Sequence, residues 1–185
     1  KLKLFIMNQK KIKILNAVFF YTIWWGCVLG IKYSYNYLGV LLTIIVGAFH
    51  INIVPDFKKE IKLILYVGLL GFVVESFYLH SHLLKYNGYI YLNSLFPPLW
   101  ILCMWLGFAG TLNYSMFWMK DRWIVMFLSG AIFGPMSYLA GLKLGVLNFN
   151  FSHLSTIIII GITWGLAIPI MYYINELIYN KELKE

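Results

Sequence analysis

The stretch SGAIFGPMSYLAGLKLG, Ser129 to Gly145, lies in a long apolar block and carries small residues at a helical spacing. Its glycines and one serine recur at three- and four-residue steps, so a helix places them on one face. Two GxxxG steps let the backbone of another helix approach closely. We therefore predict a membrane helix that packs through this face. The residues expected at the contact are Gly130, Gly134, Pro135, Gly141 and Gly145.

The composition around this stretch is that of a membrane protein. Of the 185 residues, 61% are hydrophobic and 12% are charged, and the mean hydropathy is +0.76. A helix crosses the hydrocarbon layer with about 20 apolar residues. The blocks are apolar on every side, which disfavours a barrel of alternating strands. The sequence predicts an all-α, six-transmembrane-helix bundle, with helices at Ile14–Gly30, Tyr37–Val54, Ile61–Leu79, Pro97–Met119, Trp123–Leu142 and Ser155–Tyr179.

The basic residues are sorted between the two sides of the predicted bundle. The net charge is +8, but the Lys and Arg side chains are divided among loops and do not form one face, so we expect no nucleic-acid partner. Twelve of them fall on the side of the N-terminus and three on the other, which predicts an N-in, C-in topology. The expected organisation is a basic cytoplasmic segment at 1–13, a membrane domain at 14–179 and a cytoplasmic tail at 180–185.

A few polar residues fall inside the apolar blocks, where each needs a partner or a function. Glu75 is the main candidate. We interpret it as a proton or cation site, or a general acid or base; the structural alternative is a pair with Lys143 or a hydrogen bond to Tyr138. Asn16, His50 and Asn113 are expected nearer the cytoplasmic side, and the asparagines are expected to bond across helices.

The remaining residues of interest are three deep tryptophans and two cysteines. Trp100, Trp105 and Trp164 are candidate pocket aromatics, with core filling as the alternative. Cys27 and Cys103 lie within apolar blocks and are expected to be buried thiols. There is no GxSxG, Walker or HExxH sequence, so we predict no metal and no cofactor, and the catalytic residues, if any, stay unknown.

The sequence from Pro97 onward carries a recognisable pattern. It reads P-L-W, a second Trp, T-L-N-x-S and a further Trp, followed by G-A-x-x-G-P-x-x-Y-x-x-G and L-G. This pattern resembles a family of small bacterial inner-membrane proteins catalogued as domain-of-unknown-function family 2878. Glu75 stands where that family more often has Asp. The matching residues are Pro98, Leu99, Trp100, Trp105, Thr111, Leu112, Asn113, Ser115, Trp118, Gly130, Ala131, Gly134, Pro135, Tyr138, Gly141, Leu144 and Gly145.

The resemblance implies a multi-pass protein of the bacterial inner membrane without an established activity. Some relatives are encoded beside cyclopropane-type fatty-acid synthases, which implies a link to membrane-lipid physiology. The leading hypothesis is an accessory, lipid-binding protein whose partners are membrane lipids or a lipid enzyme. A small-solute transporter is the second hypothesis, because Pro135 and Pro169 are expected to interrupt two helices. A lipid-modifying enzyme that uses Glu75 and Asn113 is the third. The oligomeric state stays open.

Overall fold

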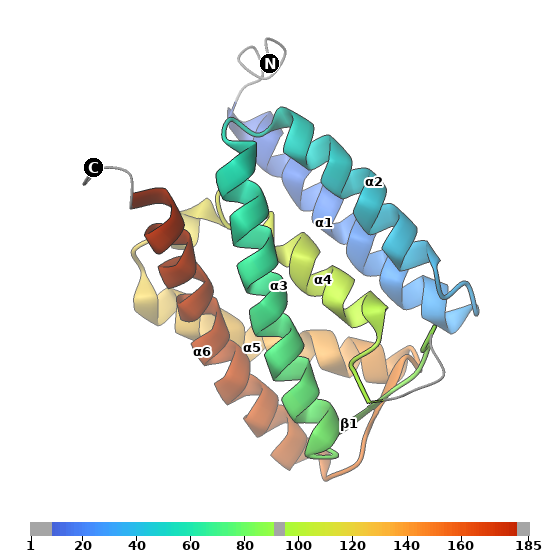
Figure 1. Ribbon diagram of the computed structural model, residues 1–185. Coiled ribbons are helices and arrows are strands. Elements are labelled where there is room, and N and C mark those ends of the chain that lie inside the picture. Colours follow the sequence, from blue (N-terminus) through green and yellow to red (C-terminus); the bar gives the residue numbers. More distant parts are fainter. Residues whose placement is uncertain (1–8, 91–94, 181–185) are drawn as a thin grey trace.

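The computed structural model describes residues 9–90 and 95–180 (Figure 1). The expected segments at 1–13 and 180–185 lie largely outside these ranges, and residues 9–13 already belong to the first helix. The helices and strands are α1 (Gln9–Lys32), α2 (Leu38–Ile53), α3 (Phe57–His80), β1 (Leu84–Tyr86), α4 (Leu99–Ala109), the 3-10 helix η2 (Phe117–Met119), α5 (Trp123–Lys143), β2 (Leu147–Phe149) and α6 (His153–Asn180).

Four of these helices are long and apolar enough to cross a membrane: α1, α3, α5 and α6. The described chain is therefore an all-α membrane protein in its main features. The predicted count of six spans is not reproduced, since α2 has 16 residues and α4 has 11.

The predicted fourth span, Pro97–Met119, breaks after Ala109, and its end is held by a residue from α1. The side chain of Asn16 donates to the carbonyl oxygen of Gly110 at 2.9 Å and accepts from the backbone N–H of Ser115 at 3.2 Å. A helix that ends inside an apolar bundle leaves backbone groups that need such partners. Short polar side chains favour this break because they bond to nearby backbone, as Thr111 Oγ1 does to the carbonyl of Phe108.

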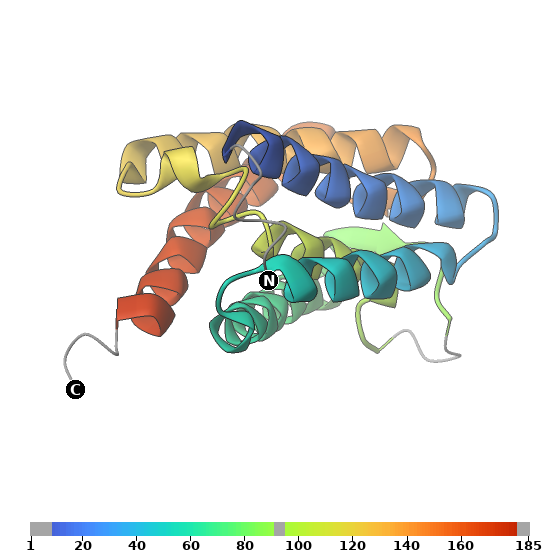
Figure 2. The same ribbon diagram turned by 90° about the horizontal axis from the view of Figure 1, so that it is seen from above.

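Helix ends gather at two sides of the bundle. The start of α1, the link from α2 to α3 and the end of α6 lie at one end, and the turn from α1 to α2 lies at the other (Figure 1). From above, α1 and α5 lie on one side and α2 and α3 on the other, with α4 between them (Figure 2). The buried side chains of all six helices meet in one core that includes Trp100, Trp105 and Met126.

A two-stranded sheet, which the sequence did not predict, lies beyond the far ends of α3 and α5. β1 and β2 pair antiparallel, with Leu84 opposite Phe149. α5 ends just before β2 in a Schellman motif, in which Gly145 N–H bonds to the carbonyl of Leu142 and Val146 N–H bonds to that of Gly141. Gly145 has a φ of +76°, so it ends the helix and does not continue its small-residue face.

Helices α5 and α6 touch at two glycines of the small-residue face. A Cβ atom at Gly130 would lie 2.1 Å from the carbonyl oxygen of Trp164, and one at Gly134 would lie 2.6 Å from the Trp164 side chain. Pro135 and Pro169 both lie inside continuous helices, so the expectation that they interrupt α5 and α6 is wrong. A proline removes one backbone donor, and here the helix carries on through it.

Candidate functional site

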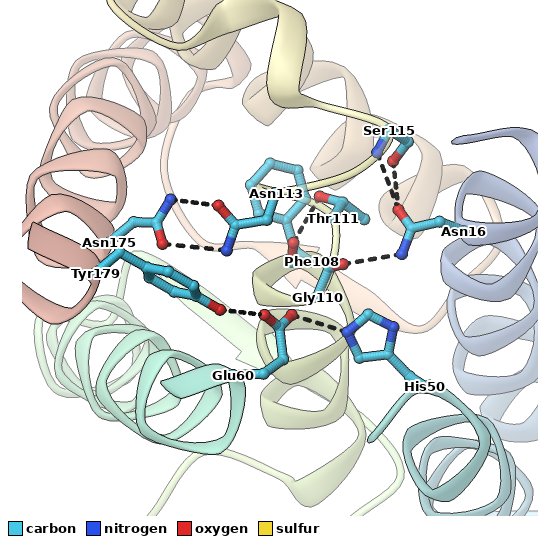
Figure 3. A network of polar contacts seen from close by, with 10 residues as sticks. All are labelled: Asn16, His50, Glu60, Phe108, Gly110, Thr111, Asn113, Ser115, Asn175 and Tyr179. Atoms are coloured by element: carbon cyan, nitrogen blue, oxygen red, sulfur yellow. Dashed lines mark hydrogen bonds and ion pairs between the residues drawn. The ribbon is translucent and has the colours of Figure 1, made fainter. Parts of the chain in front are cut away.

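Four of the candidate site residues, His50, Glu75, Trp105 and Tyr138, belong to two buried polar networks near opposite ends of α3. The first surrounds Glu60, a fully buried residue in the first turn of the helix. Its Oε1 lies 2.8 Å from Nε2 of His50 on α2, and its Oε2 accepts from the hydroxyl of Tyr179 on α6 at 2.8 Å (Figure 3). We call these three residues the Glu60 network. It joins α2, α3 and α6 at the end of the bundle where α1 begins.

Amide side chains lie next to the Glu60 network (Figure 3). Asn113 and Asn175 exchange two hydrogen bonds, of 3.1 and 2.7 Å, which connect the segment after α4 to α6. Asn16 bonds to Gly110 and to both the backbone and the hydroxyl of Ser115. The asparagines thus bond between distant segments, as their positions in apolar blocks require.

The second network surrounds Glu75, which is also fully buried. Trp105 Nε1 donates to its Oε1 at 2.8 Å, and the hydroxyls of Tyr138 and Tyr86 donate to Oε1 and Oε2. We call these four residues the Glu75 network. It connects α3, α4, α5 and β1. Burial raises the pKa of Tyr86 well above its ordinary value, and the neighbouring Glu75 carboxyl raises it further.

The partners of Glu75 decide between the structural interpretations of this residue. Of the two expected partners, Tyr138 bonds to the carboxyl, whereas Lys143 is exposed at the end of α5. Lys143 forms no ion pair within the described ranges. Three neutral donors therefore hold this carboxyl.

Glu75 lies in the Glu75 network and Asn113 bonds to Asn175, and the two share no bonding partner among the described residues. A general acid and a substrate donor must meet at one reacting group. The geometry therefore does not support the hypothesis of a lipid-modifying enzyme in which Glu75 and Asn113 act at one catalytic site.

The three candidate tryptophans lie in different surroundings. Trp100 and Trp105 are each 1% exposed, and their indole N–H groups bond to the Asn87 carbonyl and to Glu75, so both fill the core. Trp164 stacks on Trp105 with ring centroids 4.5 Å apart. It also lines a groove of about 510 Å³ between α1, α5 and α6, to which the segment from the end of α4 to η2 contributes as well. Only Trp164 of the three borders a large hollow.

A second hollow, a cavity of about 240 Å³, lies between α1, α2, α3 and α4. Its lining is apolar apart from a few groups, among them Asn16 and His50. These two side chains are 7% and 6% exposed, and His50 connects the cavity to the Glu60 network. The cavity therefore combines an apolar chamber with a polar end.

The sequence analysis missed Glu60, Tyr86, Asn175 and Tyr179. Glu60 lies in the charged run FKKEIK, immediately before the predicted start of the third helix at Ile61. Its spacing from Leu63 and Val67 places it on the buried face of α3, and this spacing was the available signal. Tyr86 reaches Glu75 through the pairing of β1 with β2, for which the sequence gives no local signal.

Comparison with known proteins gives a family and no activity. Residues 13–170 match the model of the family described as "Protein of unknown function (DUF2878)". No curated protein matches the chain significantly. No solved structure matches it significantly either. Since the match covers most of the chain, including all four residues of the Glu75 network, the chain belongs to the DUF2878 family of proteins of unknown function.

Proposed function

We propose that the protein is an accessory membrane protein that binds an acyl chain of a membrane lipid in the groove between α1, α5 and α6. The observation that carries this proposal is the groove itself. Its volume of about 510 Å³ lies within the range of about 300–1,000 Å³ that small-molecule sites occupy. The resemblance to proteins encoded beside lipid-modifying enzymes supports a role in membrane-lipid physiology.

The lining of the groove favours an acyl chain over a polar solute. Aromatic and aliphatic side chains form nearly all of it, and Ser129 and Ser137 contribute two hydroxyls. The Ser137 hydroxyl already accepts from Trp24 Nε1 at 3.2 Å. A site for a small polar solute needs several convergent hydrogen-bonding groups. This lining therefore supports lipid binding more than solute transport.

The rim of the groove is open toward the surroundings of the bundle. Phe133 and Met136 on α5 are 64% and 56% exposed and line the groove. In a bilayer these exposed side chains meet lipid tails, so a chain enters sideways without crossing a polar layer. The proposed location is the bacterial inner membrane, with the start of α1 and the α2–α3 link on the cytoplasmic side, where the basic residues are concentrated.

Lipid retention tests the proposal. The protein is extracted from membranes, transferred to a mild detergent and weighed by native mass spectrometry, once as wild type and once as Met136→Trp, which fills the groove. Ile132→Trp is the matched control, because Ile132 lies on the same helix, is 54% exposed and does not line the groove.

We expect the wild type and Ile132→Trp to keep one lipid per chain and Met136→Trp to lose it. Equal retention in all three proteins would contradict the proposal. So would a wild-type protein that carries no lipid, or one in which a second copy of the chain covers the groove.

A further inference from the structure

The 240 Å³ cavity is separate from the groove and has a polar end that the proposed function does not use. Among the described residues that line these two hollows, Phe20 alone lines both. The walls of the cavity come from α1, α2, α3 and α4, and Ile44 and Leu65, each 63% exposed, form part of its rim. In Figure 1, α2 and α3 diverge from their common link, with α4 behind them. Because Ile44 lies on α2 and Leu65 on α3, these exposed rim residues indicate that the cavity opens toward lipid at these two helices.

At the polar end, Asn16 presents one donor that has no partner among the described residues. Its Oδ1 accepts the N–H and the hydroxyl of Ser115, and its Nδ2 donates to the Gly110 carbonyl. A carbonyl can only accept and an N–H can only donate, so these partners fix the orientation of the amide. An amide nitrogen carries two protons, and one of them is left for a ligand.

His50 presents the complementary group. Its Nε2 faces Glu60, and Tyr179 donates to the other oxygen of that carboxyl. In Figure 3 the second ring nitrogen of His50 points away from Glu60. This atom, Nδ1, has no hydrogen-bond partner within residues 9–90 and 95–180, although the residue is 94% buried and lines the cavity. In the neutral tautomer that carries its proton on Nε2, facing Glu60, Nδ1 of His50 is an acceptor.

We propose that this cavity binds an amphipathic alcohol, whose hydroxyl donates to Nδ1 of His50 and accepts from Nδ2 of Asn16 while its hydrocarbon chain fills the apolar chamber. A hydroxyl is the simplest head group that both donates and accepts. The site uses none of the residues that line the groove except Phe20, so it is independent of the proposed acyl-chain site.

The charges around the cavity favour an alcohol over an anionic head group. No Lys or Arg side chain lines it among the described residues, and the Glu60 carboxyl is the nearest acidic group to His50. A fatty-acid carboxylate or a phosphate would enter an apolar chamber without a strong cation, at a high desolvation cost. A neutral hydroxyl avoids this cost.

Competition among three probes with the same chain tests the proposal on the wild-type protein. A long-chain alcohol that carries a diazirine in its tail is photo-crosslinked to the protein in lipid nanodiscs, and peptide mapping locates the adduct. Unlabelled alcohol, its methyl ether and the corresponding carboxylate compete with it. We expect adducts on α1 to α4 and competition by the alcohol at least about tenfold stronger than by the other two. Equal competition by the ether, or adducts confined to α5 and α6, would overturn the proposal.

Two variants locate the effect at the polar end and in the chamber. His50→Gln keeps an N–H near the position of Nε2 for Glu60 and removes Nδ1, so the preference for alcohol over ether should disappear. Gly47→Leu fills the chamber, because a Cβ at Gly47 meets nothing within 4 Å, and it should abolish crosslinking. Ile45→Phe, on the same helix but away from the cavity, should crosslink like the wild type. A preference unchanged in His50→Gln would contradict the assignment, while Met136→Trp tests the groove separately.

Discussion

Glu60 and Glu75 are both fully buried on α3, yet they bind different partners at opposite ends of that helix. Glu60 faces a histidine and a tyrosine hydroxyl, and Glu75 faces two tyrosine hydroxyls and an indole N–H. A buried carboxyl is tolerated when its oxygens are hydrogen-bonded. The two networks hold α3 to α2, α4, α5, α6 and β1.

The Glu75 network should behave as one unit. We expect Tyr138→Phe and Glu75→Leu each to destabilise the protein by about 1–3 kcal/mol, since each leaves a buried polar group without its partner. The double variant should lose less free energy of unfolding than the two single variants lose together, because both changes remove the same hydrogen bond. Unfolding in detergent with increasing denaturant measures the three free energies. Additive losses would show that the two side chains are not coupled.

The paired amides of Asn113 and Asn175 allow the same kind of test between α6 and the segment after α4. Each single change to alanine leaves the other amide unpaired and should cost about 1–2 kcal/mol. The double change removes both amides, so its loss should be smaller than the sum of the single losses. Thermal unfolding of the four proteins gives the comparison. Asn52→Ala, at an exposed position on α2, serves as the control and should change the stability little.

The contact between α5 and α6 depends on Gly130. A Cβ there would lie 2.1 Å from the backbone oxygen of Trp164, which no side-chain movement relieves. We expect Gly130→Ala to destabilise the protein by about 1–3 kcal/mol, as overpacking does. Gly47→Ala is the control, since its Cβ meets open space, and it should be neutral or slightly stabilising. Equal stabilities of these two variants would show that the helices approach less closely.

Alkaline pH should weaken the Glu75 network through Tyr86. Burial raises the pKa of this tyrosine in the folded protein above its ordinary value near 10. As the pH rises, the unfolded chain therefore loses the Tyr86 proton before the folded protein does. The stabilisation of the folded state by neutral Tyr86 is thus complete below about pH 10 and declines as the pH rises further. We expect a smaller loss of stability between pH 9 and 11, roughly the range of tyrosine ionisation, in Tyr86→Phe than in the wild type. Tyr35→Phe, at a 69% exposed position, is the control and should follow the wild type.

The sequence predicted the features that depend on composition and local spacing. The membrane class, the helical content and the close approach at Gly130 follow from apolar blocks and a four-residue repeat of glycine. The break after Ala109 escaped prediction, because it depends on Asn16, 94 residues from Gly110 in the chain. Glu60 was misplaced because Asp56 caps α3 and begins the helix earlier than the apolar run suggests.

The most direct test of the central claim is a map of the protein in lipid nanodiscs, determined by cryo-electron microscopy with a bound antibody fragment to add mass. The account predicts elongated density of one acyl chain in the groove, in contact with Trp164 and Phe133. A groove closed by protein side chains, or one that contains only the diffuse density of surrounding lipid, would contradict it.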